Sequence, residues 1–167
     1  MTGRYDRRVG INKVFLSNDS QGLNTSEVTI PELLRQEGYA TGMIGKWHLG
    51  WDFDAIRKPG VEKKDWPKAD SYDWTKRFPG GPLERGFNHY FGDGTINFPP
   101  YCWIEDDRFL TIPTQPVTKS KPLAGGGSFR PGPMAASWSP YDILPTVTEK
   151  TVEWISKQTS DQPFFVY

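Results

Sequence analysis

The feature that most constrains this chain is a helix signal followed by a glycine and a strand-like run, between residues 29 and 50. Thr29 and Glu32 have the spacing of a capping box, in which the threonine hydroxyl accepts a hydrogen bond from the glutamate amide. An apolar stripe at helical spacing follows at Ile30, Leu33 and Leu34. Gly38 suits the left-handed conformation that ends a helix. The pattern predicts a short amphipathic helix that leads directly into a strand.

Residues 39–48 are predicted to be that strand. Alternate side chains of a strand share one face, which here would hold Ala40, Gly42, Ile44, Lys46 and His48. Lys46 and His48 would lie about 6.6 Å apart along this face, close enough to converge on one anion. Gly45 and Gly50 bracket the pair and allow the backbone to bend or a ligand to approach. Because ligands bind at the carboxyl ends of strands in open α/β sheets, this run is a candidate anion site.

Other interpretations of this run must be weighed beside the anion site. A lone lysine is most often solvated, and a lone histidine most often has a structural role. A phosphate-binding loop ending at Lys46 would need glycine at position 40 and serine or threonine at position 47, but these positions hold Ala40 and Trp47. The phosphate loop is therefore excluded, and spacing alone does not separate the remaining interpretations.

Charge and composition narrow the possible partners. Twenty Lys and Arg residues balance twenty Asp and Glu residues, so the formal net charge is zero. The net charge therefore gives no electrostatic reason to expect binding to nucleic acid or to an anionic membrane. The longest apolar runs fall well short of the ~18 residues of a membrane span, and residues 1–12 do not show a basic-then-apolar signal sequence. Cys102 is the only cysteine, so an internal disulfide framework and a cysteine zinc cluster are excluded, and we expect it to pack in the core.

The rest of the chain alternates long irregular stretches with two further regular elements. Residues 51–82 lack a sustained period and residues 111–140 are rich in proline and glycine, so both are expected to be loop excursions without regular structure. An apolar helix pattern around residues 147–155 and a buried-strand run at 164–167 then repeat the order of helix and strand. This order predicts an α/β fold.

The excursion of residues 51–82 offers further candidate contacts. It carries the tryptophans Trp51, Trp66 and Trp74. They could stack on sugar or aryl rings, although burial against the domain is the commoner role of such residues. Asp52, Asp54 and the acidic run 105–107 could hold a cation, although solvated charge is the commoner interpretation. No residue of this chain is therefore assigned to a metal.

The run from position 38 to position 50 resembles the second signature of the type I sulfatases, a branch of the alkaline-phosphatase-like hydrolases. The matching residues are Gly38-Tyr39-Ala40-Thr41-Gly42 and Gly45-Lys46-Trp47-His48-Leu49-Gly50. By this resemblance Lys46 contacts the sulfate, which makes it both a catalytic and a substrate-binding residue. The same resemblance makes His48 a catalytic residue that contacts the formylglycine of the family.

Residues near the start resemble the tail of the first sulfatase signature, at Thr2-Gly3-Arg4-Tyr5 and Arg8-Val9-Gly10. In the family that signature begins with Cys or Ser followed by x-Pro-x-Arg, and the Cys or Ser becomes formylglycine. The resemblance implies that the nucleophile lies upstream of Met1 and that the chain is an internal fragment. The family's divalent cation, usually calcium, would also take its ligands from outside, because no paired aspartate motif lies near the N-terminus.

Later segments extend the resemblance along nearly the whole chain. Residues 83–92 are similar to the arginine-glycine-phenylalanine segment that commonly follows the second signature, and His89 within it is expected to be structural. Residues 97–101 and 104–108 resemble bacterial arylsulfatases, in which aspartate is usual in place of Asn97. Because the family's aspartate is replaced here by Asn97, we do not assign a polar role to this residue from the resemblance.

The resemblance implies that residues 1–167 are part of a sulfatase catalytic domain, with an incomplete mixed sheet flanked by helices and the second-signature strand near its centre. The implied activity is hydrolysis of aryl or carbohydrate sulfate esters by a secreted or periplasmic enzyme, and this chain alone is expected to be inactive. Alternatives are a phosphate or phosphonate monoester hydrolase of the same superfamily, a noncatalytic remnant that binds carbohydrate, and an ordinary α/β domain with a coincidental match. The sequence indicates no oligomeric state.

The signature tail makes a prediction about the gene. Extending the reading frame upstream of Met1 should reveal Cys or Ser followed by x-Pro-x-Arg within about a dozen residues. Sequencing of the upstream DNA checks this expectation. An in-frame stop codon immediately before Met1, without a frameshift, would instead show a remnant and contradict the interpretation as part of an intact enzyme.

Overall fold

The computed structural model describes residues 1–17, 19–63, 67–118, 121–122 and 128–167. In chain order its elements, with η for a 3₁₀ helix, are η1 (Asp6–Val9), α1 (Ile30–Gln36), β1 (Ala40–Lys46), η2 (Phe53–Ile56), η3 (Pro82–Arg85), β2 (His89–Gly94), β3 (Ile104–Glu105), β4 (Arg108–Phe109), β5 (Gln115–Val117), β6 (Lys121–Pro122), β7 (Ser128–Phe129), β8 (Gly132–Met134), η4 (Pro140–Asp142), α2 (Ile143–Ser156) and β9 (Phe164–Val166).

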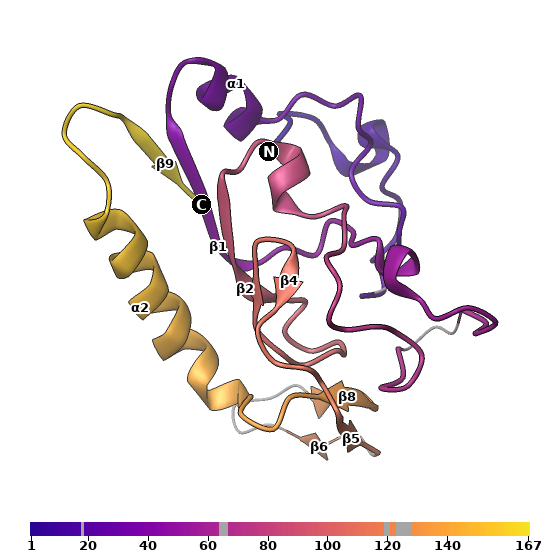
Figure 1. The fold of residues 1–167 in the computed structure, drawn as a ribbon. Coiled ribbons are helices and arrows are strands. Elements are labelled where there is room, and N and C mark those ends of the chain that lie inside the picture. The colour runs from indigo at the N-terminus through magenta and orange to yellow at the C-terminus, as the bar shows by residue number, and fades with distance from the viewer. Residues whose placement is uncertain (18, 64–66, 119–120, 123–127) are drawn as a thin grey trace.

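A five-stranded mixed sheet forms the body of the fold, in the order β4-β3-β2-β1-β9. β1 pairs in parallel with β2 on one side and with β9 on the other. From β2 the sheet continues antiparallel through β3 and β4. Figure 1 shows α2 lying along the sheet and α1 beside the start of β1. The predicted α/β class and the interior position of the strand that carries the second signature are confirmed.

The capping signals for α1 are confirmed, but two residues of the predicted apolar stripe do not pack in the core, since Ile30 is 47% exposed and Leu33 is 53% exposed. The Thr29 hydroxyl accepts from the Glu32 amide at 3.3 Å, and the Thr29 amide donates to the Glu32 carboxylate at 2.7 Å. Gly38 follows the helix with φ 84, a left-handed value that glycine adopts at little cost. Thr29 is buried, and its hydroxyl also donates to the Arg85 carbonyl at 2.8 Å. The helix cap therefore ties α1 to the segment that precedes β2.

The contact of α2 with the sheet depends on a glycine of β1. A Cβ atom on Gly42 would lie 2.7 Å from Cε2 of Trp154, closer than a side chain tolerates. The Trp154 ring in turn meets the ring of Phe164 edge to face, with 5.9 Å between centroids. α2 therefore packs across β1 and β9 together. The helix and strand predicted around residues 147–155 and 164–167 are present as α2 and β9.

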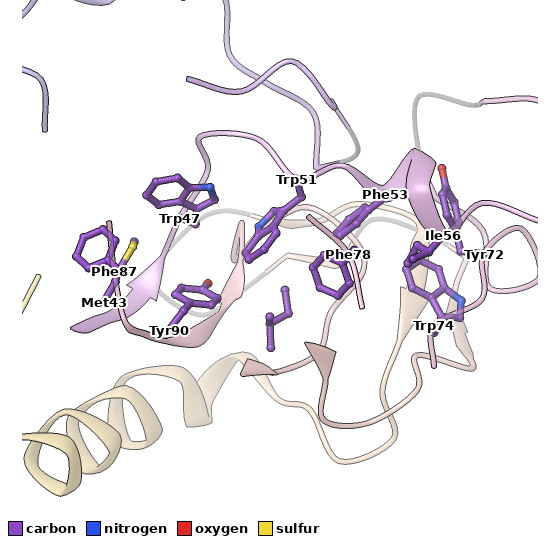
Figure 2. Close-up of a cluster of buried hydrophobic side chains, with 11 residues drawn as sticks. Met43, Trp47, Trp51, Phe53, Ile56, Tyr72, Trp74, Phe78, Phe87 and Tyr90 are labelled. Carbon is purple, nitrogen blue, oxygen red and sulfur yellow. The ribbon is translucent and has the colours of Figure 1, made fainter. Parts of the chain in front are cut away.

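The main hydrophobic core is largely aromatic and lies on the other face of the strands from α2 (Figure 2). Its members are Met43, Trp47, Trp51, Phe53, Ile56, Tyr72, Trp74, Phe78, Phe87, Tyr90 and Ile104. Phe53 is 1% exposed, and its ring centroid lies 5.1 Å from that of Phe78 and 6.2 Å from that of Trp74. Because these rings belong to residues 51–82, this excursion folds back onto the sheet and supplies much of the core.

The hypothesis that tryptophans of this excursion contact substrate is wrong for two of them. Trp51 is 2% exposed and Trp74 is 4% exposed. The Trp74 indole nitrogen donates to the Ala69 carbonyl at 2.8 Å, so its polar atom is satisfied inside the protein. Burying an aromatic ring removes on the order of 150–250 Å² from water, which favours the core over the surface. Trp66 lies outside the residues that the structure describes.

The prediction that residues 111–140 lack regular structure is also wrong. β5 pairs antiparallel with β8, with Pro116 opposite Pro133, and β6 pairs antiparallel with β7. Proline cannot donate to a strand ladder, but a two-stranded ribbon has outer edges at which no donor is needed. Residues 125–127, whose glycines supported the prediction, lie outside the described residues.

A second core cluster lies between this excursion and the sheet. It comprises Tyr101, Cys102, Val117, Phe129, Ala135 and Trp138. Cys102 is 0% exposed, and burial raises the pKa of its thiol well above the usual value. The expected packing role of this cysteine is confirmed, since a buried neutral thiol is neither a nucleophile nor a metal ligand.

Large apolar side chains remain exposed on the helices and at the β9 edge of the sheet. On α2, Leu144 is 73% exposed and Val152 is 62% exposed. Next to β9, Tyr167 is 64% exposed, and within the described residues β9 has a partner strand on one side alone. An unpaired strand edge beside apolar surface is a site at which chains associate.

We therefore expect the isolated 167-residue chain to self-associate and to unfold without a single cooperative transition. Sedimentation velocity at several concentrations and thermal unfolding measure these properties. Leu144→Glu and Val152→Glu together should reduce the association, because they place charge on the exposed face of α2. A monodisperse monomer with cooperative unfolding would contradict the prediction.

Candidate active site

Parallel pairing brings the carboxyl ends of β1 and β2 to one edge of the sheet. Lys46, the last residue of β1, lies opposite Gly94, the last residue of β2. The Trp47 amide donates to the Gly94 carbonyl at 3.0 Å and extends the contact one residue beyond the strand. Side chains that follow both strands can converge at this edge, which is the usual position of a ligand site in an α/β sheet.

β1 is not regular as far as His48, and the prediction that alternate side chains from position 40 to position 48 share one face is wrong. The register of β1 with β2 shifts between Ile44 and Lys46. Gly45, between them, has φ 131, a value that side-chain-bearing residues rarely adopt. After this shift Lys46 lines a cavity together with Met43, a residue of the main core. The glycine therefore decides which way the lysine faces.

The two predicted site residues lie at the same cavity, which has a volume of ≈ 430 Å³. Its polar lining side chains are Thr2, Arg4, Asp6, Lys46 and His48. The N-terminal segment is held in place by an Arg4–Glu27 ion pair of 2.8 Å and by a 3.0 Å hydrogen bond from the Ile30 amide to the Met1 carbonyl. The residues that resemble the two sulfatase signatures, distant in the chain, thus meet in space.

His48 is fixed in one orientation. Its backbone is left-handed, with φ 52. Its Nε2 atom lies 2.8 Å from the Phe15 carbonyl oxygen, and its ring centroid lies 5.4 Å from that of Phe98. Because a carbonyl can only accept, Nε2 carries the hydrogen, and the neutral ring then has its lone pair on Nδ1.

The electrostatic environment keeps His48 neutral. Partial burial lowers the pKa of the His48 imidazole below 6.5, and the nearby positive charge of Lys46 lowers it further. The hydrogen bond to the Phe15 carbonyl opposes this shift. Lys46 itself is exposed, at the wall of the cavity. A cation and a neutral imidazole acceptor are therefore available side by side.

Asp93 is a buried charge near this site that the sequence pattern does not single out. It is 4% exposed, and burial raises the pKa of its carboxyl from 3.8 to about 7, against the opposing effects of the Ile96 amide and the charge of Lys46. Oδ1 accepts from the Ile96 amide at 3.1 Å, whereas Oδ2 has no hydrogen-bond partner among the described residues. An aspartate between two glycines at the end of a strand parallel to β1 is the signal that could have found it.

Three of the acidic candidates outside this edge lie next to basic side chains. Asp52 differs from them, because its Oδ1 atom is buried without a hydrogen-bond partner among the described residues. Asp54 contacts Lys63 at 2.9 Å, and Asp107 contacts Arg77 at 2.8 Å. Asp106 lies 3.1 Å from Nδ1 of His89, a residue at the start of β2 and so at the opposite end of that strand from Gly94. Across the described residues, no group of three or more His, Cys, Asp or Glu side chains is arranged to hold a metal ion.

The fold is shared with solved structures of longer proteins. A solved protein from work on the metabolism of multiple glycosaminoglycans by Bacteroides thetaiotaomicron superposes with a TM-score of 0.70 at 22% identity, covering 100% of this chain and 38% of that one. The protein Ps i-CgsB, solved in complex with a neocarrahexaose, superposes with a TM-score of 0.55 at 19% identity, covering 100% and 31%.

The chain belongs to the sulfatase family, whose model, described as Sulfatase, matches residues 1–167. Arylsulfatase G of Rattus norvegicus is 29% identical over 182 residues, covering 100% of this chain and 29% of that protein. N-acetylgalactosamine-6-O-sulfatase of Bacteroides thetaiotaomicron is 24% identical over 199 residues, covering 100% and 36%. The chain thus spans about a third of each of these relatives.

The raised pKa of Asp93 predicts a pH dependence of stability. Between pH 4 and pH 7 the folded state binds more protons at this group than the unfolded chain does, so the free energy of unfolding falls as the pH rises through this window. Asp93→Asn should remove this fall, which amounts to at most roughly 4 kcal/mol. Urea unfolding of the complete gene product at pH 5 and pH 8 measures it, because the isolated chain is not expected to unfold cooperatively.

The exposed Asp70→Asn variant is the matched control and should keep the pH dependence of the parent. An equal fall in unfolding free energy between pH 5 and pH 8 for the parent and for Asp93→Asn would show that Asp93 does not titrate in this window.

Proposed function

We propose that residues 1–167 form part of the catalytic domain of a sulfatase and that the whole protein hydrolyses sulfate esters. The observation that carries this proposal is the meeting of Lys46 and His48 with Thr2 and Arg4 at one cavity, in a chain that matches the family model along its length. The relatives named above are sulfatases, which favours sulfate over phosphate esters as the substrate.

In this proposal Lys46 binds the sulfate. Its ammonium lies at the carboxyl end of β1, exposed to the cavity, where it can contact the nonbridging sulfate oxygens. Negative charge on the sulfate group and the leaving oxygen changes as the ester bond breaks. A fixed cation placed there in advance lowers the barrier without a reorganisation cost at the moment of reaction.

His48 assists the nucleophile in this proposal. Its Nε2 atom is occupied by the Phe15 carbonyl, which leaves Nδ1 as the atom that can accept a hydrogen bond. The lowered pKa keeps Nδ1 unprotonated at neutral pH, so it can accept the proton of a hydroxyl group. The formylglycine of the family supplies that hydroxyl as its hydrate, and we expect it outside this chain.

The proposal also covers the metal ion, the substrates and the cellular compartment. We expect the family's calcium ion to take its ligands from outside this chain, because the described side chains do not form a cluster that fits a metal. We propose aryl or carbohydrate sulfates as substrates and a secreted or periplasmic location. In the part of the chain that the structure describes, neither helix has the length and hydropathy of a membrane span.

Substitution of Lys46 tests the proposal in the complete gene product with its nucleophile in place. Lys46→Ala should lower kcat for an aryl sulfate by roughly 10²–10³-fold, or ~3–4 kcal/mol, because a transition-state charge contact is lost. Lys46→Arg should not fully restore kcat, since the planar guanidinium is wider than the ammonium. His48→Ala should also reduce turnover.

Lys68→Ala is the control, because Lys68 is exposed and does not line this cavity. It should leave kcat/KM unchanged. A folded Lys46→Ala protein with kcat/KM within about threefold of the parent would remove Lys46 from the site.

A further inference from the structure

A further cation, besides Lys46 and Arg4, lies near the candidate active site, on the excursion of residues 111–140. The guanidinium carbon of Arg130 lies 4.2 Å from the ring centroid of Phe98. The ring of Phe98 is the one that lies 5.4 Å from the His48 ring. Arg130 is therefore one aromatic ring away from the imidazole that the proposed reaction uses, although the two residues are far apart in the chain.

Backbone atoms of residue 130 help to hold this segment in place. The Arg130 amide donates to the Tyr101 hydroxyl oxygen at 2.7 Å, and the same hydroxyl lies 3.0 Å from the Arg130 carbonyl oxygen. Tyr101 is 1% exposed and belongs to the second core cluster with Phe129, the neighbour of Arg130. Any residue at position 130 could keep these backbone contacts, so they do not explain an arginine there.

The side chain of Arg130 is half-buried and contacts the loop after β2. Nη1 donates to the Asn97 carbonyl oxygen at 3.1 Å, and the guanidinium plane rests on the Phe98 ring. Asn97 and Phe98 lie in the loop that follows β2, the strand whose end faces Lys46. A guanidinium held in this way loses little conformational freedom when it binds an anion, and its planar fork matches a carboxylate or a sulfate.

From this geometry we propose that Arg130 is a specificity-determining residue that binds a second anionic group of the substrate. This inference rests on the proposed sulfatase function and adds a substrate class to it. The scissile sulfate occupies the cavity at Lys46 and His48, and a carboxylate or second sulfate on the same or the adjacent sugar reaches past Phe98 to Arg130. The favoured substrates are thus sulfate esters of acidic or multiply sulfated sugars.

The experiment uses the complete gene product and matched pairs of ligands. The first pair is N-acetylgalactosamine 6-sulfate and its 4,6-disulfate; the second is a 6-sulfated disaccharide with a uronate carboxylate and its neutral methyl ester. Each compound is measured as a substrate, and as a competitive inhibitor of 4-nitrophenyl sulfate turnover. We expect the member of at least one pair with the extra anion to bind more tightly, and the responsive pair distinguishes a sulfate from a carboxylate.

Arg130→Met keeps the length and apolar stem of the side chain and removes its charge. It should weaken binding of the favoured member of the pair roughly 10–100-fold and binding of the other member less than threefold. The kcat for 4-nitrophenyl sulfate should be unchanged. Arg108→Met is the matched control, because Arg108 is an exposed arginine that lies 3.8 Å from Asp107, outside the site. It should not change the binding of either pair of ligands.

Three outcomes would overturn the inference. The first is that the parent enzyme shows no preference for the more anionic member of either pair. The second is that Arg130→Met weakens binding of both members of a pair equally, as expected of a structural role. The third is a folded Arg130→Gln protein, used if Arg130→Met does not fold, that keeps the full preference of the parent. Failure of the parent to hydrolyse any of the sulfate esters would instead count against the proposed sulfatase function.

Discussion

The parallel pairing of β1 between β2 and β9 is the interaction on which the rest of this structure depends. It sets the carboxyl end of β1 beside the carboxyl end of β2, and so places Lys46 next to the end of the strand that carries Asp93 and to the loop that follows it. α2 can pack across β1 and β9 because Gly42 has no side chain that would clash with Trp154. A parallel strand buried on both faces tolerates few substitutions, which suits an element that positions a site.

The local irregularity of β1 arranges the charges of the site. The register shift at Gly45 turns Lys46 towards the cavity, and the left-handed backbone at His48 brings its imidazole to the Phe15 carbonyl. The lysine remains exposed, the imidazole is driven towards its neutral form, and Asp93 is buried on the neighbouring strand with a raised pKa. Desolvation is the largest cause of the pKa shifts of both His48 and Asp93. Burial, more than pairing between charges, therefore sets the protonation states of these two side chains.

The two long excursions are anchored to the rest of the fold mainly by aromatic rings, although the second also forms the short ribbons β5-β8 and β6-β7. Ordering a loop costs about 1–2 kcal/mol per residue in backbone entropy, so a long irregular segment needs a large buried area to stay in place. The first excursion buries Trp51, Phe53 and Trp74 against the sheet, and the second returns to it through Phe129 and Trp138. The aromatic side chains that look like ligand contacts in the sequence are therefore what fixes the loops, and the second excursion delivers Arg130 to the site.

The sequence by itself determined the local elements and indicated the family. The Thr29 cap, the Gly38 stop and the signature around Lys46 and His48 act over a few residues, so spacing is enough to find them. Only the tertiary structure decided the direction of Lys46, the burial of Trp51 and the proximity of Arg130 to His48. These depend on a register shift, on the packing of distant rings and on the return of a long loop, and no pattern of neighbouring residues records such contacts.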